Sequence, residues 1–181
     1  MASHEFSMLR LEPYSGDRNL DDIFCQIFDE TELPYLGALL HDGVSRGSFI
    51  GLDEKGVQAF ILVHETPEGH ADYEISFLGV SAPYRRNGYA ERLLQMTIVA
   101  LDGASLWLQV LKDNEKACKL YTKMGFDLAE EFATSSDETG LLWFYGVAYL
   151  CSGCNKQIVA SQTLWTDGTP YCVDCYKIGD I

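Results

Sequence analysis

The sequence predicts an α/β protein, with a mixed, mostly antiparallel sheet flanked by helices and a small cysteine-rich module at the C-terminus. Three observations support this expectation. Strand-like and helix-like segments alternate in the middle of the chain, which is typical of parallel strands joined by a crossover helix. Two short apolar segments near the front are joined by a polar link that contains glycine, which indicates an antiparallel hairpin. Four of the six cysteines form two pairs after Leu150.

The front of the chain predicts one strand and a divided helix. Residues 6–11 form a short apolar segment that suits a first strand. Over residues 19–40 the apolar side chains recur at helical spacing, and Asn19 is placed to cap the start of this helix. Pro34 lacks the N–H that a helix interior needs, so we expect it to divide the helix into two pieces.

A hairpin and a buried strand follow. Residues 48–52 and 57–64 predict two strands, and the polar link at 53–56 predicts the turn between them. Tyr73–Val80 is an extended apolar run that suits a buried strand, and Pro83 ends it.

The next part of the chain alternates helices and strands. The helix that starts near Ala90 is indicated by apolar side chains at helical spacing. Gly125 is placed to end a second helix. The elements expected after the first helix are a strand at Leu106–Leu111, a helix at 114–124, and a strand pair at 126–132 and 141–150 around a polar loop.

The loop between the central strand and its helix has the composition of an anion site. The start of a helix presents unpaired N–H groups, and Gly88 lets backbone approach a phosphate without a Cβ in the way. Ala90 keeps the next approach small, and two arginines add positive charge. We therefore expect a site for an anion such as a phosphate over the following residues: Arg85, Arg86, Asn87, Gly88, Tyr89 and Ala90.

Length, composition and charge favour a globular protein and disfavour a membrane-spanning or nucleic-acid-binding one. A chain of 181 residues suits one domain with a small appendage, and its 47% hydrophobic content suits a buried core. No apolar run reaches the roughly 18–20 residues of a membrane span, and the first residues lack a signal-peptide core. We expect a soluble, cytoplasmic protein. The net charge of −14 disfavours nucleic-acid binding and favours a cationic partner.

Two motifs carry a family resemblance. Residues 85–90 match Arg-x-x-Gly-x-Ala, which resembles the pyrophosphate loop of the GNAT N-acetyltransferases. Residues 114–126 read Asn-x-x-Ala-x-x-Leu-Tyr-x-x-x-Gly-Phe, which closely resembles the second half of the signature of that family. The resemblance covers roughly residues 6–150. It implies a GNAT-type sheet, acetyl-coenzyme A as cosubstrate, and direct transfer of the acetyl group to an amine in a ternary complex.

The resemblance also implies which residues bind the cofactor. The amides of the 85–90 loop would hold the pyrophosphate. The backbone of Leu78, Gly79 and Val80 would pair with the pantetheine arm and polarise the thioester carbonyl, with Gly79 giving room for that approach. Asn114 would contact coenzyme A, and Ala117 would let the cofactor lie close.

Two further residues are implied as catalytic. Glu74, eleven residues before Arg85, would accept the proton of the acceptor ammonium, and Tyr121 would protonate the leaving thiolate. The residues themselves also support these roles, because a carboxylate flanked by apolar residues can have its pKa raised. Asn114, Ala117 and Tyr121 are three and four residues apart, so one helix face presents them together. The alternatives are a solvated strand glutamate and a core tyrosine; His64, His70 and Glu65 are further candidates for a proton relay.

The acceptor is the most open part of the prediction. Acidic residues in the first helical region and at the tip of the last loop favour a polyamine, or the lysine or N-terminus of a basic peptide, with an aminoglycoside as a third option. These acidic residues are Asp21, Asp22, Asp29, Glu30 and Glu32, then Asp137 and Glu138. A rival hypothesis is a non-catalytic acyl-coenzyme A sensor, but binding alone needs neither Glu74 nor Tyr121.

The C-terminal cysteines have the spacing of a metal site. Cys151 and Cys154 are followed, after seventeen residues, by Cys172 and Cys175, a strong four-thiolate spacing for structural Zn²⁺. Iron or two disulfides are the alternatives. We expect an acetyltransferase domain at 1–149 and a zinc knuckle at 150–181.

The cysteine-rich segment resembles a GATA-type or LIM-type treble-clef finger. It lacks the basic residues with which a GATA finger grips DNA, since it holds two lysines against three aspartates. A structural cap or a protein-contact module is therefore favoured. The remaining cysteines, Cys25 and Cys118, are expected to be buried thiols on helices.

Overall fold

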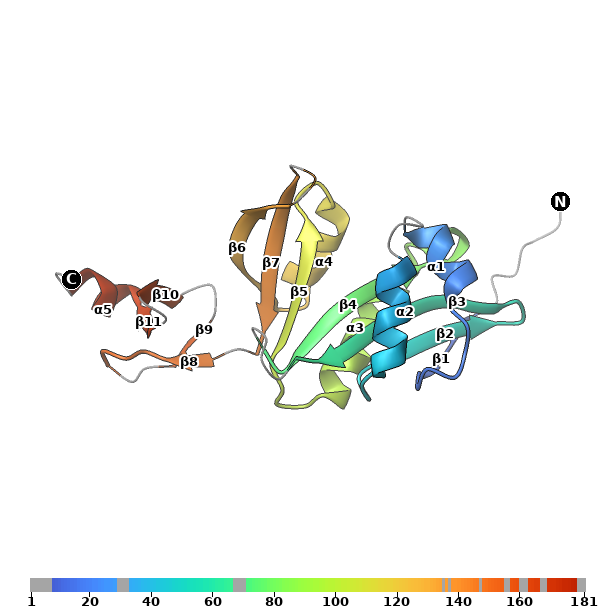
Figure 1. Ribbon diagram of the computed structural model, residues 1–181, viewed down its shortest axis with the longest axis horizontal. Helices are drawn as coiled ribbons and strands as arrows, with labels where there is room; N and C mark the ends of the chain where they lie inside the picture. Colours follow the sequence, from blue (N-terminus) through green and yellow to red (C-terminus); the bar gives the residue numbers. More distant parts are fainter. Residues whose placement is uncertain are drawn as a thin grey trace. The chain divides into compact units, whose positions relative to one another are not determined.

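The computed structural model describes residues 8–28, 33–66, 71–134, 136, 138–146, 148–154, 157–159, 163–166 and 169–178. The first part of the chain contains, in order (Figure 1), β1 (Arg10–Pro13), α1 (Asp21–Ile27), α2 (Leu33–Asp42), β2 (Phe49–Asp53), β3 (Gly56–Glu65), β4 (Tyr73–Val80), the 3-10 turn η2 (Ala82–Tyr84) and α3 (Tyr89–Ala100). The second part contains β5 (Leu106–Leu111), α4 (Glu115–Lys123), β6 (Asp127–Ala133), β7 (Thr139–Tyr145), β8 (Ala148–Leu150), β9 (Gln157–Val159), β10 (Thr163–Thr166), β11 (Thr169–Cys172) and α5 (Val173–Ile178).

Seven strands hydrogen-bond in the order β1-β2-β3-β4-β5-β7-β6, and β8-β9 and β10-β11 form separate two-stranded sheets. The pair β4-β5 is parallel, whereas β1-β2, β2-β3, β5-β7 and β6-β7 are antiparallel. The predicted α/β fold with a mixed, mostly antiparallel sheet is therefore confirmed. The chain divides into two compact units, residues 1–65 with 75–102 and residues 66–74 with 103–181, so that β4 contributes to both.

The first unit is a sheet covered on both faces. Figure 1 shows α1 and α2 on one side of β1–β4 and α3 on the other. This double cover explains why residues 59–63 of β3 form an uninterrupted apolar run, each completely buried. On the α3 side, the hydroxyl of Thr97 donates to the carbonyl oxygen of Gly47 at 2.7 Å. On the other side the core contains Tyr14, Leu20, Ile23, Phe24, Leu36, Leu39, Ile50, Leu52, Phe60 and Leu62.

The divided helix is confirmed, with two differences in detail. The cap residue of α1 is Leu20, and Asn19 instead accepts the N–H of Asp21 at 2.7 Å through its side-chain oxygen. Asn19 thus still accepts an N–H of the first turn, but it lies one residue before the cap residue instead of being the cap residue itself. Pro34 lies in the first turn of α2, where its missing N–H costs no hydrogen bond. The acidic residues Asp29, Glu30 and Glu32 lie outside the described residues.

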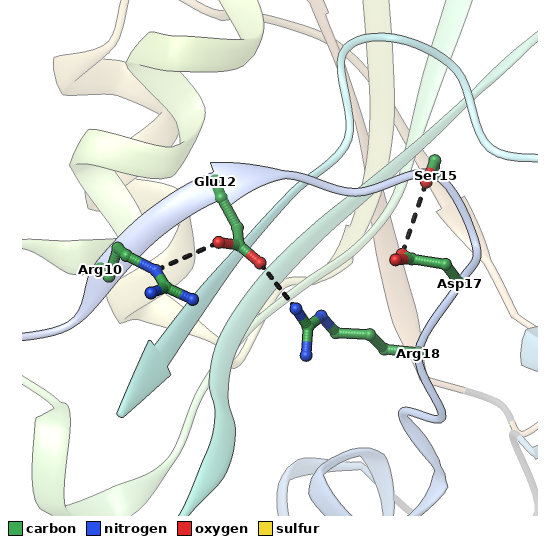
Figure 2. A network of polar contacts seen from close by, with 5 residues as sticks. All are labelled: Arg10, Glu12, Ser15, Asp17 and Arg18. Atoms are coloured by element: carbon green, nitrogen blue, oxygen red, sulfur yellow. Dashed lines mark hydrogen bonds and ion pairs between the residues drawn. The ribbon is translucent and has the colours of Figure 1, made fainter. Parts of the chain in front are cut away.

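The link after β1 is held by polar contacts at the surface (Figure 2). Glu12 accepts hydrogen bonds from Arg10 at 3.1 Å and from Arg18 at 3.2 Å, and Ser15 donates to Asp17 at 3.4 Å. Exposed pairs of this kind stabilise a fold by less than about 1 kcal/mol each. Their effect here is to fix the path of the link between β1 and α1. Residues 6 and 7 of the predicted first strand lie outside the described residues.

In the second unit, β7 alternates its side chains between two faces. Leu142 and Phe144 pack with Trp107 on one face. Trp143 lies on the other face and contacts Tyr121 of α4, with ring centroids 6.5 Å apart. The single strand predicted at 141–150 is wrong, because β7 ends at Tyr145 and Gly146 has a positive φ of 71° before β8 begins. No helix in the described ranges is long and apolar enough to cross a membrane.

Candidate functional site

The loop after β4 turns twice through the left-handed region before α3 begins. Arg86 has a φ of 65° and Gly88 a φ of 78°. Glycine adopts this conformation at little cost, whereas arginine adopts it only with strain. No side chain caps α3, whose cap residue is Gly88. The start of the helix, where the sequence predicts an anion site, is thus not occupied by a capping side chain.

Three of the predicted loop residues are partly engaged within the protein. Arg85 donates through Nε to the carbonyl oxygen of Val80 at 2.9 Å, and Asn87 donates to the carbonyl oxygen of Tyr84 at 3.2 Å. The side chain of Tyr89 is buried, and its hydroxyl accepts the N–H of Leu9 at 2.9 Å. Tyr89 therefore offers a cofactor only its backbone. Arg86 is exposed, and no ion pair joins it to a carboxylate among the described residues.

Gly79 has a packing role in this unit. A Cβ at this position would lie 3.0 Å from the side chain of Ile27 and 3.2 Å from that of Phe28. The space that the sequence assigns to an approaching cofactor is thus occupied by α1 and the residue after it on that side of the strand. This packing is enough to explain why residue 79 is a glycine. Only the backbone N–H of Gly79 therefore stays in the prediction of cofactor binding, together with the backbone N–H groups of Leu78 and Val80.

Glu74 is the last residue of β4 that pairs with β5. The parallel register joins Tyr73 to Leu106 and Glu74 to Trp107, whereas β5 pairs with β7 along its whole length. Residues in register share a face, so Glu74 lies on the same face as the apolar cluster of Trp107, Leu142 and Phe144. Burial raises the pKa of Glu74 above its ordinary value. A carboxylate with a raised pKa is a better proton acceptor near neutral pH.

Tyr121 is a buried tyrosine on α4. Its ring lies 5.6 Å from that of Phe126 and 6.5 Å from that of Trp143, centroid to centroid. Burial, with a smaller contribution from Cys118, raises the pKa of Tyr121 to about 12, so the hydroxyl keeps its proton at neutral pH. No described residue forms a hydrogen bond with this hydroxyl. It remains able to donate to a ligand.

Asn114 and Ala117 lie at the start of the same helix. Asn114 is the cap residue of α4, and its Oδ1 accepts the N–H of Ala117 at 3.3 Å. The exposed Asn114 thus has a structural role that leaves its side-chain NH₂ for a ligand. Asn114 and Ala117 are in contact, and Tyr121 lies about one turn further along the same helix. Gly125, with a φ of 86°, ends the helix.

One polar pair was not found by sequence reasoning. The hydroxyl of Ser76 lies 2.7 Å from Nδ1 of His64, joining β4 to β3. Such a contact fixes the orientation of an imidazole. Ser76 follows Glu74 by two residues, so both side chains point to one face of β4. The sequence suggested His64 as a relay residue, but nothing in its spacing identifies Ser76 as its partner. His70 lies outside the described residues.

The four C-terminal cysteines come together in one cluster. Their sulfur atoms all lie within 4.8 Å of one another, and those of Cys154 and Cys172 are 3.8 Å apart. A tetrahedral Zn²⁺ with Zn–S bonds of about 2.3 Å places its sulfurs about 3.8 Å apart, so the cluster has the size of such a site. None of the four forms a disulfide. The donor set therefore fits a metal ion.

Hydrogen bonds within the cluster separate the thiol pKa values. The N–H of Cys172 donates to the sulfur of Cys151. This hydrogen bond is the largest of several effects, which together lower the pKa of Cys151 to about 6. Contacts with the other thiols, first that of Cys154, raise the pKa of Cys175 to about 12. The expectation that Cys25 and Cys118 are buried is wrong, since Cys25 is exposed and Cys118 half-buried.

Comparison with known proteins places the chain in a family. A family model described as the acetyltransferase (GNAT) family matches residues 17–126. That range includes Glu74, the 85–90 loop and Tyr121. No match was found among curated protein sequences.

Solved structures share the fold at low sequence identity. Arabidopsis thaliana Naa50, in complex with the bisubstrate analogue CoA-Ac-MVNAL, matches with a TM-score of 0.59 and 18% identity, over 76% of this chain and 98% of that chain. Arabidopsis thaliana NAA60 with a bisubstrate analogue matches with a TM-score of 0.60 and 19% identity, over 76% and 97%. The ribosomal-protein-S18-alanine N-acetyltransferase of Escherichia coli matches with a TM-score of 0.57 and 20% identity, over 76% and 92%.

The predicted resemblance, fold and enzyme class are therefore confirmed at the level of the family. The chain belongs to the GNAT family of acetyltransferases and is an acetyl-coenzyme A-dependent N-acetyltransferase.

Proposed function

We propose that this enzyme acetylates a primary amine of a peptide or protein, at an N-terminus or a lysine. The observation that carries the proposal is the environment of Glu74. This carboxylate lies on the apolar face of β4 and β5, and burial raises its pKa. An ammonium has no lone pair and must lose a proton before it can attack a thioester. A carboxylate with a raised pKa, acting directly or through water, suits that task.

The proposed reaction is direct transfer. Glu74 accepts a proton from the ammonium, and the amine nitrogen attacks the thioester carbon to give a tetrahedral intermediate. The C–S bond then breaks with its electron pair on sulfur, and the hydroxyl of Tyr121 gives its proton to that sulfur. The nitrogen loses its second proton to water as the amide forms. Cys118 lies within residues 114–126, but at a position that the motif leaves open, so no acetyl-enzyme is included.

The cofactor roles remain assigned by motif. The 85–90 loop is proposed to bind the pyrophosphate through its amides and Arg86, with Arg85 as a second cation. The backbone N–H groups of Leu78, Gly79 and Val80 are proposed to contact the pantetheine arm and the thioester carbonyl. Asn114 and Ala117 are proposed to contact coenzyme A. The absence of a side-chain cap at the start of α3 and the NH₂ group of Asn114 support these roles.

The structural neighbours favour a peptide over a polyamine. Naa50 was solved with a bisubstrate analogue that joins coenzyme A to the peptide MVNAL, and the Escherichia coli enzyme is named for an alanine of a ribosomal protein. The net charge of −14 is in keeping with a basic peptide. Exposed carboxylates of Asp21 and Asp22 at α1 and of Glu138 before β7 supply part of that charge. A polyamine stays the second candidate on charge alone.

The test is release of free thiol from acetyl-coenzyme A with a panel of amines. The panel contains basic peptides with free or blocked N-termini, spermidine, spermine and an aminoglycoside. We expect turnover with peptides, lost on blocking the N-terminus or the lysine according to which is used. Turnover with the polyamines alone would correct the acceptor. Tight coenzyme A binding without turnover would favour the non-catalytic sensor.

We further propose that Cys151, Cys154, Cys172 and Cys175 hold one structural Zn²⁺ within the knuckle at 150–181. Four thiolates close a tetrahedron and leave no position for substrate, so the ion would stabilise the fold of the segment. The size of the cluster and the absence of disulfides among these cysteines support the proposal. The surface of the knuckle is a candidate contact for a protein partner.

A further inference from the structure

A buried donor in β7 lacks a hydrogen-bond partner. In the part of the chain that the structure describes, the indole nitrogen Nε1 of Trp143 is buried and has no acceptor. Only 7% of the residue is exposed. Buried tryptophan N–H groups usually have an acceptor, and an unmet donor lowers the stability of the fold. Such a group in a folded protein calls for a functional explanation.

The neighbour of Trp143 is the proposed general acid. The rings of Trp143 and Tyr121 lie 6.5 Å apart, centroid to centroid, and are inclined by 48°. Tyr121 is also only 7% exposed, and no described residue forms a hydrogen bond with its hydroxyl. On the α4 face of β7, a buried tryptophan with an unmet donor therefore adjoins a buried tyrosine whose hydroxyl has no partner among the described residues.

We propose that Trp143 is a positioning residue for acetyl transfer. Its indole N–H, unpaired in the resting protein, donates a hydrogen bond to the phenolic oxygen of Tyr121 during the reaction, directly or through one water molecule. This inference rests on the proposed role of Tyr121 as the general acid. Because an indole N–H can only donate, it would occupy a lone pair of the oxygen and leave the O–H to point at the sulfur.

The hydrogen bond from Trp143 would have its largest effect when Tyr121 loses its phenolic proton. Transfer of the Tyr121 proton to the sulfur leaves a phenolate, which water reprotonates before the next turnover. Burial disfavours that phenolate, as the raised pKa of Tyr121 shows. A donor directed at the oxygen stabilises the negative charge where it develops. The cost of an unmet donor in the resting protein is then offset during catalysis.

Trp107 provides a control for the stability measurement. Its Nε1 donates to the hydroxyl of Thr66 at 3.2 Å, and it lies on the opposite face of the sheet from Tyr121. Replacement of either tryptophan by phenylalanine keeps an aromatic ring and removes one N–H. Trp107→Phe breaks a hydrogen bond that the structure contains, whereas Trp143→Phe removes a donor that has no partner in it.

The experiment compares the full-length wild type with Trp143→Phe, Tyr121→Phe, the double variant and Trp107→Phe. Steady-state thiol release, with the acceptor peptide found in the panel, is measured with thermal unfolding. We expect Trp143→Phe to lower kcat about tenfold, the effect of one hydrogen bond to a charged group. The KM of this variant for acetyl-coenzyme A should be unchanged. Its melting temperature should be unchanged or higher. In the Tyr121→Phe background the same change should have no further effect. Trp107→Phe should lower the melting temperature.

Two results would overturn the inference alone. One is a wild-type kcat in Trp143→Phe, while Tyr121→Phe is slow. The other is an equal fold-loss from Trp143→Phe with and without the Tyr121 hydroxyl, which would mean that Trp143 does not act through it. Absence of turnover by the wild type with every acceptor would overturn the proposed function, and this inference with it.

Discussion

The hydroxyl of Tyr84 donates a 2.6 Å hydrogen bond to Oδ2 of Asp53, which joins the turn before the 85–90 loop to the end of β2. The other oxygen of Asp53 accepts the N–H of Lys55 at 2.7 Å and Nε2 of Gln58 at 3.3 Å. Partial burial acts to raise the pKa of Asp53, but these hydrogen bonds together outweigh it and the pKa is lowered. The base of the loop is thus anchored to a neighbouring hairpin by a charged acceptor.

Tyr84→Phe should therefore lower both stability and cofactor affinity. We expect a loss of about 1–2 kcal/mol in the free energy of unfolding and a severalfold weaker Kd for acetyl-coenzyme A. Because folding lowers the pKa of Asp53, its stabilising effect is present above the unfolded pKa and disappears as the pH falls through the folded value. Urea unfolding of the wild type and of Tyr84→Phe at neutral and acidic pH tests this expected difference in stability. Tyr35→Phe, on an exposed tyrosine of α2, is the control. Equal stabilities at neutral pH would contradict the anchoring role.

Gly88→Ala separates the backbone cost of the loop from its ligand role. Gly88 has a φ of 78°, and a Cβ there would meet no atom within 4 Å. The substitution should thus cost about 1 kcal/mol of stability through conformation alone. Gly103 is a matched control, since its φ is 77° and its Cβ site is also open. We expect Gly88→Ala and Gly103→Ala to lose similar stability, and only Gly88→Ala to weaken acetyl-coenzyme A binding, by about tenfold, in calorimetric titrations. Equal affinities in the two variants would remove Gly88 from the cofactor site.

The sequence allowed the central elements to be predicted closely. β4 and β5 have the predicted bounds, because mostly apolar runs end shortly before Pro83 and at the polar segment after Leu111. The ends of α4 were readable as well, since a capping asparagine and a left-handed glycine act on neighbouring residues. Local chemistry of this kind is visible in a sequence.

Contacts between distant residues were not predictable in the same way. The packing of Gly79 against Ile27 depends on where α1 lies on the sheet. The unmet N–H of Trp143 depends on which side chains surround it. The break at Gly146 was missed because hydrophobic residues flank it, and periodicity does not register one residue with a positive φ. Motifs could suggest Glu74 and Tyr121, but the raised pKa of each follows from burial in three dimensions.

Glu74→Gln should change the pH dependence of the reaction. A base must be deprotonated to act, so the rate should fall as the pH falls through the pKa of Glu74. Because burial raises that pKa, this fall should lie above pH 4.5, the ordinary value. Glu74→Gln is expected to lower kcat by about 100-fold or more and to abolish the acidic limb of the profile. Glu54→Gln, on an exposed glutamate of the β2–β3 turn, should keep both. An acidic limb that survives in Glu74→Gln would assign the base to another group.

Metal analysis distinguishes the three hypotheses for the cysteine cluster, which are bound zinc, bound iron and two disulfides. Elemental analysis of the purified protein should give about one zinc per chain, since four thiolates fill a tetrahedral shell. Cys154→Ser should lower the zinc content and increase proteolysis within residues 151–178, because a short segment with a small core depends on its metal. Cys25→Ser is the control, since this cysteine is exposed and lies outside the cluster. Iron in place of zinc would correct the metal. Two disulfides found by mass spectrometry, with no bound metal, would reject the site, because a sulfur held in a disulfide is no longer a thiolate ligand.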